Sequence, residues 1–233
     1  WDPERLRLKD EIETGSLGPI ILAYSPDGRF LAVGGYPRRD TQILDTRDGT
    51  VTGLSGHGRS GVTSLAFGKQ GQILATGGGD VVSLWNVVEK TQVHALKLGD
   101  GFLQAMAINP AGTLLATGGW YRGTNQSGDL LYLWDFATGT FVAELEGDRR
   151  SIHDLAFHPD GQRLAALDPD GRMRVWDVPS RQQRQAIHGF TQPVYSIDFS
   201  PDGRLLATAG GGGSVRLWDM DTRRQAAIGE DIG

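Results

Sequence analysis

The residues best suited to chemistry in this sequence are five histidines and a few short runs of carboxylates and glycines. His153 stands beside Asp154, and His158 follows at a spacing that suggests a general base or a metal site. Both histidines, however, lie at opposite ends of one expected strand, where extended backbone holds them too far apart to bind the same ion. We therefore predict structural roles for both.

Two further segments resemble ligand loops but lack essential parts. The run Asp168-Pro169-Asp170-Gly171 has only some of the oxygen ligands of a calcium loop. The glycines from Gly210 to Gly213 lack the lysine and the helix start of a phosphate-binding loop. No nucleophile elbow, Walker loop or pair of catalytic carboxylates occurs. The sequence thus predicts no catalytic residue, no metal and no cofactor, in a chain that is not an enzyme.

Composition narrows the range of partners. The 233 residues include no cysteine, which suits a reducing cytoplasm, and the formal net charge is -5. A negative surface repels phosphate backbones and anionic lipids, so nucleic acid and membranes are poor partners. No apolar run reaches the roughly 18 to 20 residues that span a bilayer, and no signal peptide is visible. The chain begins with Trp1 rather than Met, which suggests an excerpt of a larger chain.

An internal repeat organises the whole sequence. Turn-forming segments end in glycines spaced 43, 41, 49 and 42 residues apart, at Gly28, Gly71, Gly112, Gly161 and Gly203. A second marker, an aromatic residue or leucine followed by Asp or Asn, starts at Trp1 and recurs with spacings of 43, 41, 49, 42 and 42 residues, at Leu44, Trp85, Trp134, Trp176 and Trp218. Two markers with one period indicate a supersecondary unit of about 42 residues.

Each unit contains four short runs in which apolar and polar residues alternate, which is the pattern of β-strands. In the second unit these runs are 62–67, 73–76, 82–85 and 92–96. Val62, Leu65 and Phe67 break the alternation by one residue, so a β-bulge is expected to turn all three inward. The proline and glycine of segments such as Ser25-Pro26-Asp27-Gly28 specify a tight turn between the first two strands. Each unit is therefore predicted to be a four-stranded antiparallel sheet.

The Trp-Asp pairs that close third strands, the Ser-Pro-Asp-Gly turns and the Leu-Ala-Thr-Gly second strands together resemble the WD-repeat (WD40) family, across essentially the whole chain. The resemblance implies an all-β β-propeller, whose blades pack around a central channel and serve mainly as an interaction scaffold. It also implies a structural tetrad of hydrogen-bonded side chains, which the second unit carries nearly completely as His57, Thr76, Asp80 and Trp85. Other units depart from this set, so we expect softer blades at positions one and four.

Five blades and one orphan outer strand account for the sequence. The predicted propeller region covers 1–233, with blades at 18–59, 60–101, 102–150, 151–192 and 193–233, and with the outer strand of a preceding blade in 1–17. The surplus strand favours a ring of six or more blades in a larger protein, and the family resemblance suggests a bacterial one. A five-bladed ring with one displaced strand, or closure by homo-oligomerisation, are the alternatives.

The family resemblance also implies where a partner would bind, because in WD-repeat proteins the second-to-third strand loops share one face with the loops that enter the first strands, and this face is the usual binding surface. The third unit lengthens its loop with Trp120, Tyr121 and Arg122, a composition typical of binding hot spots. The alternative is that Trp120 folds back to cap its own blade. Further members of this aromatic and basic rim are Tyr36, Arg38, Arg39, Arg149, Arg150, Phe190 and Tyr195. Such a rim suits a protein or peptide partner, in particular an acidic one.

The predicted function is a non-enzymatic protein-interaction scaffold or sensor module within a larger regulatory or signalling protein. Two alternatives stand beside it. One is a structural assembly subunit whose propeller is closed by oligomerisation. The other is a propeller that binds a small ligand or performs catalysis in its central channel, which would require a layer of inward carboxylates or histidines that the repeats do not show.

Overall fold

The computed structural model describes residues 20–35, 40–55, 61–68, 70–99, 101–121, 129–145, 151–187, 193–211, 215–222 and 224–229. These ranges contain strands and no helix, and hence no helix able to cross a membrane. The strands form five separate four-stranded sheets, each paired antiparallel in chain order. The prediction of an all-β chain with five four-stranded blades is confirmed. The predicted orphan strand in 1–17 lies outside the described residues.

The strands follow one another blade by blade. The first blade consists of β1 (Ile20–Tyr24), β2 (Phe30–Gly35), β3 (Asp40–Asp45) and β4 (Val51–Ser55). The second consists of β5 (Ser64–Phe67), β6 (Ile73–Gly78), β7 (Val81–Asn86) and β8 (Thr91–Lys97). The third consists of β9 (Gly101–Ile108), β10 (Leu114–Tyr121), β11 (Asp129–Asp135) and β12 (Phe141–Glu144). The fourth consists of β13 (Asp154–Phe157), β14 (Arg163–Leu167), β15 (Met173–Asp177) and β16 (Gln182–Ile187). The fifth consists of β17 (Val194–Phe199), β18 (Leu205–Gly210), β19 (Val215–Asp219) and β20 (Arg224–Gly229).

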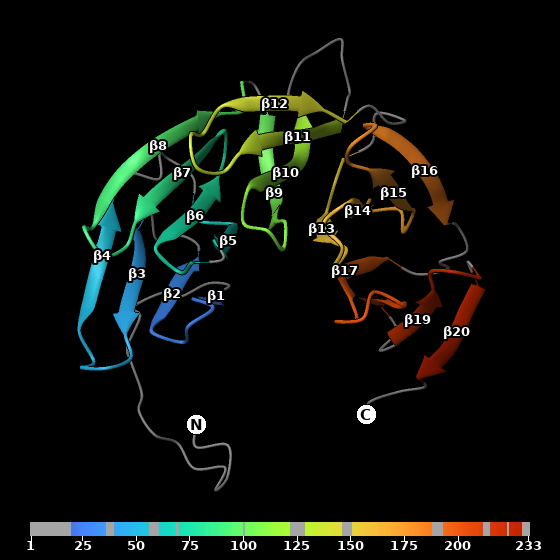
Figure 1. Cartoon of the computed structure of the whole chain (residues 1–233), viewed down its shortest axis with the longest axis horizontal. Coiled ribbons are helices and arrows are strands. Elements are labelled where there is room, and N and C mark those ends of the chain that lie inside the picture. The colour runs from blue at the N-terminus through green and yellow to red at the C-terminus, as the bar shows by residue number, and fades with distance from the viewer. Residues whose placement is uncertain are drawn as a thin grey trace, which may run out of the picture.

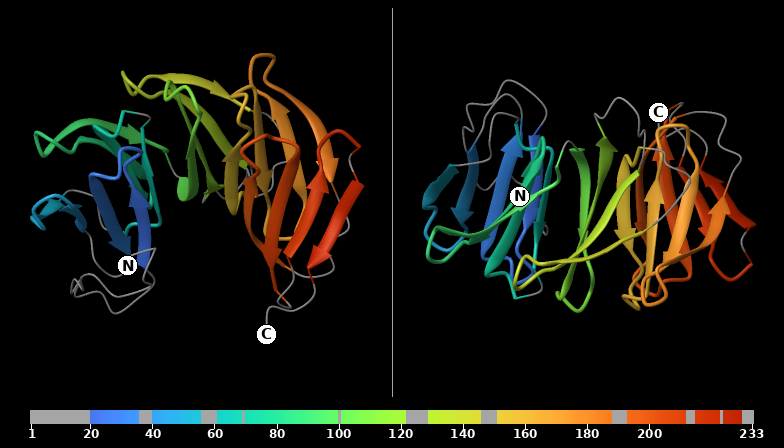
Figure 2. Two further views of the ribbon diagram at one scale, coloured as in Figure 1. Left: turned by 60° about the horizontal axis from the view of Figure 1, so that its bottom comes forward. Right: turned by 90° about the horizontal axis from the view of Figure 1, so that it is seen from above.

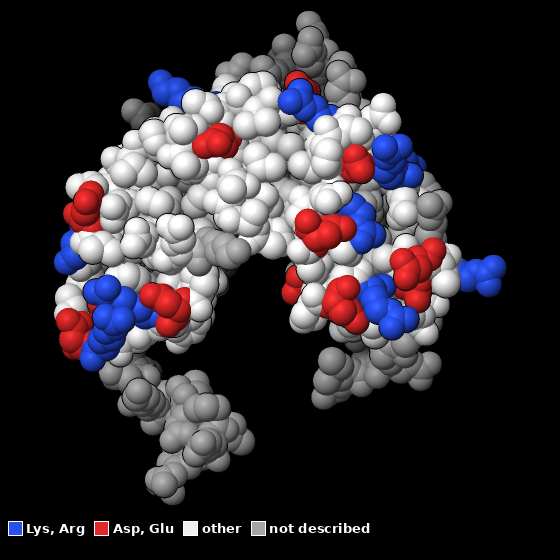
Figure 3. Space-filling model, in the orientation of Figure 1, with Lys and Arg blue, Asp and Glu red and all other residues white. Residues whose placement is uncertain are grey.

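The five blades stand around an arc, with their first strands inside and their fourth strands outside (Figure 1). The inner strands contact one another in the order β1, β5, β9, β13 and β17. Figure 2 shows that the strands run along the axis of the arc, so the connections between them gather at two opposite edges. The first and last blades face each other across an opening (Figures 1 and 3).

Each hydrophobic core is shared by two consecutive blades. Four clusters of buried side chains fill the four spaces between neighbouring blades. In every cluster a third-strand tryptophan of the later blade packs against alanine and aliphatic side chains of the earlier one. These tryptophans are at most 8% exposed: Trp85, Trp134, Trp176 and Trp218. In these four blades the tryptophan-bearing face therefore packs against the preceding blade.

The predicted bulge occurs at the start of the first strand. In the third blade the register of β9 against β10 shifts between Gly118 and Gly119, and in the fifth blade Tyr195 is the extra residue. In the second blade Val62 is 2% exposed, and Leu65 and Phe67 pack against the core shared with the first blade. The expectation that this pattern turns three side chains inward is confirmed.

The tight turns between first and second strands also follow their sequence. In the first blade the Ser25 hydroxyl accepts the N–H of Phe30 at 2.8 Å, and Asp27 accepts the N–H of Arg29 at 3.1 Å. The last residue of each turn has a φ between 67° and 73°, the left-handed region that glycine adopts without steric cost. These turns fix the angle at which each second strand leaves the inner strand.

Candidate binding surface

The structure contains half of the predicted tetrad, and it recurs in three blades. The indole N–H of Trp85 donates to the hydroxyl of Thr76 at 2.8 Å, and both side chains are buried. The equivalent bonds join Trp134 to Thr117 at 2.9 Å and Trp218 to Thr208 at 3.1 Å. Asp80 is exposed in the two-residue turn between β6 and β7, and His57 lies outside the described residues. The tryptophan–threonine pair thus pins the second strand to the third.

The fourth blade replaces this pair by a different contact. Ala166 stands where the second, third and fifth blades have threonine, opposite Arg174 in the β14–β15 register. Arg174 is 1% exposed, and its guanidinium carbon lies 5.1 Å from the centre of the Trp176 ring. A buried cation on an aromatic face is attractive because the ring face carries negative charge. The tryptophan of this blade is therefore still held against its own sheet.

Trp120 and Tyr121 lie in strand β10 rather than in the loop where the sequence placed them. In the register Trp120 is opposite Phe102 and Tyr121 is opposite Gly101. The rings of Trp120 and Phe102 stack with centroids 5.2 Å apart and an interplanar angle of 21°. The longer repeat of the third blade thus comes partly from longer strands, and Trp120 is half-buried on its own blade.

A second pair of aromatic rings lies on the next two blades, and a backbone hydrogen bond links its segment to that of the stack. The carbonyl of Gly119, beside Trp120, accepts the N–H of Ile152 at 3.0 Å. His153 follows, and its ring lies 5.9 Å from the ring of Tyr195, which is 57% exposed. We define the candidate binding surface as Phe102, Trp120, His153 and Tyr195. It occupies the edge of the arc where first strands begin and second strands end.

A carboxylate joins two blades beneath this surface. Asp154 accepts the N–H of Leu155 at 2.9 Å and, across the blade boundary, the N–H of Ile197 at 2.8 Å. Burial raises the pKa of Asp154 above its usual range, although these hydrogen bonds oppose the shift. Its geometry is that of a structural acceptor that satisfies a backbone N–H on the inner edge of the fifth blade.

The second histidine of the possible metal site has a structural position. His158 is 5% exposed, its Nε2 lies 2.9 Å from the carbonyl oxygen of Gly203, and its ring meets the Phe199 ring edge-on at 5.0 Å. It therefore contacts the turn of the next blade at the edge opposite to His153. Across the described part of the chain, no three histidine, aspartate or glutamate side chains gather in a way that would hold a metal ion.

The edge opposite the candidate binding surface carries charges of both signs. Figure 3 shows acidic and basic side chains next to one another over the first blade and over the last two. Ion pairs at 3.0 Å join Arg29 to Asp45 and Arg163 to Asp160, in the first and fourth blades. Among the described residues, this face therefore shows alternating charges rather than one extended basic patch.

The other predicted rim residues lie outside the described residues. They are Tyr36, Arg38, Arg39, Arg122, Arg149, Arg150 and Phe190. Of the predicted set, the structure describes Trp120 and Tyr121 on the third blade and Tyr195 on the fifth. It adds Phe102 and His153, which sequence reasoning did not assign to partner binding.

The matches to known proteins agree with this architecture. The family model described as "WD domain, G-beta repeat" matches residues 48–86, 139–177 and 181–219, which is half of the chain. Each matched range starts just before a fourth strand and ends with the Trp-Asn or Trp-Asp pair that closes the next third strand. The family's repeat therefore coincides with the structural repeat.

Several curated proteins are similar over part of their length. The "Periodic tryptophan protein 2 homolog" of Mus musculus is 30% identical over 118 residues, covering 50% of this chain and 12% of that protein. The "Serine-threonine kinase receptor-associated protein" of Dictyostelium discoideum is 26% identical over 58% of this chain and 43% of its own length. The "WD repeat-containing protein SL1-17" of Schistosoma mansoni is 28% identical over 76% of this chain and 56% of its own length.

The chain spans less than two thirds of the length of each of these relatives. All three are eukaryotic, which gives no support to the predicted bacterial source. WD-repeat proteins are in general non-enzymatic interaction scaffolds. The matched repeats and the five four-stranded blades that contain them show that this chain belongs to the WD-repeat (WD40) family.

Proposed function

We propose that this chain is an interaction scaffold that binds a protein or peptide through the candidate binding surface. The observation that carries the proposal is the aromatic strip, which consists of two ring contacts, Phe102 with Trp120 and His153 with Tyr195, on three consecutive blades. Aromatic rings supply large contact area at a low cost in side-chain entropy, and tyrosine and tryptophan are enriched at binding hot spots. This role requires no catalytic chemistry.

The scaffold is further proposed to serve a regulatory or signalling assembly. The support is the Dictyostelium relative, which is named for its association with a serine-threonine kinase receptor. An acidic partner remains part of the proposal through the arginines of the predicted rim, which lie outside the described residues. Comparing the affinities of acidic and neutral peptides that carry the same aromatic anchor would test the preference for an acidic partner separately from partner binding in general.

The test is partner capture by the whole chain and by two aromatic variants of similar exposure. Tyr195→Ala removes the most exposed ring of the candidate binding surface, whereas Phe141→Ala removes a ring that is 56% exposed on the outer strand of the third blade. A hot-spot residue contributes at least about tenfold in affinity, so a specific partner should be lost with Tyr195→Ala and retained with Phe141→Ala. Equal capture by all three proteins would refute the assignment of this surface.

A second candidate role, in assembly, is favoured by the two end faces of the arc. On the first blade Leu22 and Tyr24 are 61% and 63% exposed, and Tyr24 stands in register with Leu31. On the fifth blade Ala207 pairs with Leu217, as Ala75 pairs with Leu84 in the second blade, where the pair is fully buried under the next tryptophan. We propose that further blades, from the same polypeptide or from a second copy, cover these faces.

Light scattering of the purified chain over a range of concentrations tests the assembly role. If a second copy covers the end faces, the mass exceeds that of a monomer, and Tyr24→Glu reduces it because a charge would be buried without a partner. A monomer at all concentrations would exclude self-assembly and leave covalently linked blades as the occupant.

A further inference from the structure

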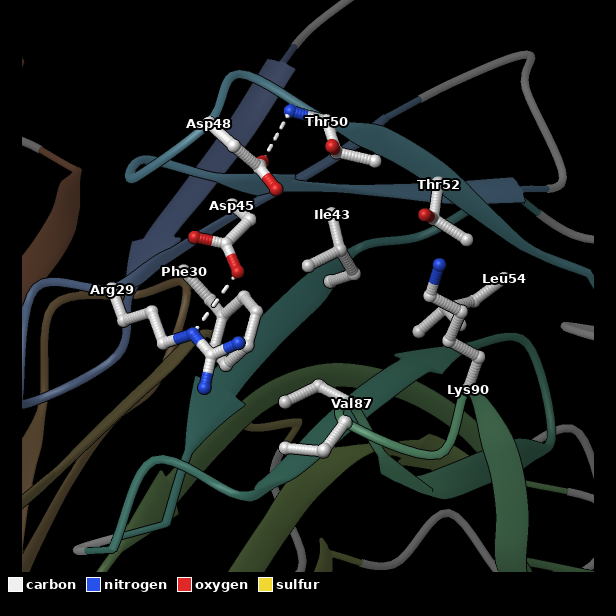
Figure 4. Close-up of a pocket in the computed structure, with 11 residues that line it drawn as sticks. Arg29, Phe30, Ile43, Asp45, Asp48, Thr50, Thr52, Leu54, Val87 and Lys90 are labelled. Carbon is white, nitrogen blue, oxygen red and sulfur yellow. Dashed lines mark hydrogen bonds and ion pairs between the residues drawn. The ribbon is translucent and has the colours of Figure 1, made fainter.

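An opening of about 180 Å³ lies between the first two blades, at the edge opposite the candidate binding surface (Figure 4). The start of β2, the turn from β3 to β4 and the turn from β7 to β8 border it. Sites for free drug-sized ligands usually have volumes of roughly 300 to 1,000 Å³. The opening, which we call the blade pocket, therefore has room for a single residue of a longer partner.

The floor of the blade pocket is apolar. Phe30, Ile43, Leu54 and Val87 line it, and each is at most 7% exposed. All four belong to the core that the first two blades share. Val88 extends this apolar surface to the rim, where it is 52% exposed. An aliphatic side chain that enters the pocket would therefore leave water and contact the edge of the inter-blade core.

Most charged groups of the rim already have partners. The Arg29 guanidinium donates to Asp45 at 3.0 Å and lies 4.5 Å from the centre of the Phe30 ring. Asp48 accepts the N–H of Thr50 at 2.9 Å, and hydrogen bonds from the Thr50 backbone and side chain hold the pKa of Asp48 below its usual range. The two carboxylates of the rim are thus already engaged by donors of their own blade.

Lys90 differs from these groups. Its ammonium makes no hydrogen bond or ion pair within the described part of the chain, and Figure 4 shows it extending over the opening toward Thr52. Its backbone is also unusual, because φ is 59°, a region that side chains other than glycine rarely adopt. The equivalent turns of the first and third blades have glycine there, at Gly49 and Gly139. The second blade has a lysine, and the fourth has Arg181, at a position where glycine would be less strained.

We propose that the blade pocket binds the C-terminal residue of a partner peptide when that residue is aliphatic. Its carboxylate pairs with the Lys90 ammonium, and its side chain lies on the apolar floor. A C-terminal residue fits because it carries both groups on one α-carbon, within the volume of a single residue. Charge complementarity determines the occupant, because the unpartnered charge among the described rim residues is a cation. The site is independent of the aromatic strip, which lies at the other edge.

Fluorescence anisotropy with the whole chain tests this proposal. The probe is a labelled glycine–serine heptapeptide that ends in leucine, prepared once with a free carboxylate and once with a C-terminal amide. A charge-assisted hydrogen bond corresponds to about tenfold or more in affinity. The free acid is therefore expected to bind at least tenfold more tightly than the amide, with a preference that weakens as salt is added.

Two glycine variants separate binding from folding. Lys90→Gly removes the ammonium and relieves the left-handed backbone strain, so its melting temperature should equal or exceed that of the wild type while the preference for the free acid disappears. Arg181→Gly makes the same change in the turn from β15 to β16, where φ is 60°, and should leave peptide affinity unchanged. Tyr195→Ala should also bind the peptide normally, which distinguishes this site from the proposed partner surface.

Three results would overturn the proposal. The first is equal affinity for the free acid and the amide, including no binding of either at millimolar concentration. The second is a preference for the free acid that survives Lys90→Gly. The third is equally tight binding of an amidated peptide with an internal Glu-Leu pair, which would show that a terminal carboxylate is not the group recognised.

Discussion

Gly78→Ala is expected to destabilise the protein strongly, because a methyl group at this position meets backbone. Gly78 ends β6 beside the bulge of the inner strand, and a Cβ built on it would lie 1.9 Å from the carbonyl oxygen of Gly61. Real Cβ contacts essentially never fall below 3.0 Å, so residues 61 and 62 would have to move by about 1 Å. Both of these residues are buried, so the displacement occurs within packed structure.

The expected loss is about 2 to 3 kcal/mol. Overpacking of a well-filled interior usually costs about 1 to 3 kcal/mol. The upper part of this range applies because the displaced Val62 packs against the first blade, where a Cβ on Gly34 would already lie 2.9 Å from its Cγ1. For a domain of this size, about 1 kcal/mol corresponds to roughly 2 to 4 °C in the melting temperature. The variant should therefore melt about 4 to 12 °C below the wild type.

Thermal melting followed by circular dichroism, together with urea titration, provides the measurement. Gly53→Ala is the matched control, because Gly53 lies on the outer strand β4 and a Cβ added there would have nothing within 4 Å. The melting temperature of this control should change by about 2 °C at most. If Gly78→Ala proved as stable as Gly53→Ala, the close packing of second-strand glycines on the inner strand would be refuted.

Three further substitutions test single contacts. Thr117→Val removes the hydroxyl that accepts the buried Trp134 indole N–H, so urea titration should show a loss of about 1 to 3 kcal/mol that Thr117→Ser largely restores. Burial raises the folded-state pKa of Asp154 above 3.8, so ionisation of this carboxyl destabilises the folded state. The unfolding free energy of the wild type relative to that of Asp154→Asn should therefore fall as the pH rises from 3.8 to the folded-state pKa. A difference that stays constant with pH would contradict this. Gly203→Ala should lower the unfolding free energy by about 1 kcal/mol or more beyond Gly28→Ala. Both glycines have a φ near 70°, but only a Cβ on Gly203 would lie 2.2 Å from the His158 imidazole of the preceding blade. Equal losses of stability would argue against that contact.

The blades could be predicted because each strand and turn has its own local sequence pattern. The one-residue break at Val62 and Leu65 indicated the bulge, and the turn segment at Ser25 formed the expected tight turn. Strand ends were harder to predict. The sequence predicts Trp120 and Tyr121 in a lengthened loop after Gly118 and Gly119, whereas β10 continues to Tyr121. The reason is that Gly118 leaves space for Ile152 of the next blade and Gly119 for the carbonyl of Phe102, so these glycines serve packing within a strand.

The site was less predictable than the fold because it depends on contacts between units. The stack of Trp120 on Phe102 follows from pairing of two strands, which a search for loop insertions does not consider. The contact of His153 with Tyr195 joins two blades through residues that are 42 positions apart. The blade pocket likewise combines turns of two blades, around Asp48 and Lys90. Periodicity identifies each unit, but only the stacking of units decides which side chains meet.

The consistent direction of the tryptophans has a consequence for how the molecule can be rearranged. Every interface joins the tryptophan-bearing face of one blade to the alanine-bearing face of the blade before it, so each blade has two different and complementary faces. A duplicated or transplanted blade would therefore form the same kind of interface with both of its neighbours. Tandem duplication of a blade would leave the existing interfaces unchanged. Reversing a single blade would instead place two tryptophan-bearing faces against each other, which the fixed direction of the backbone forbids.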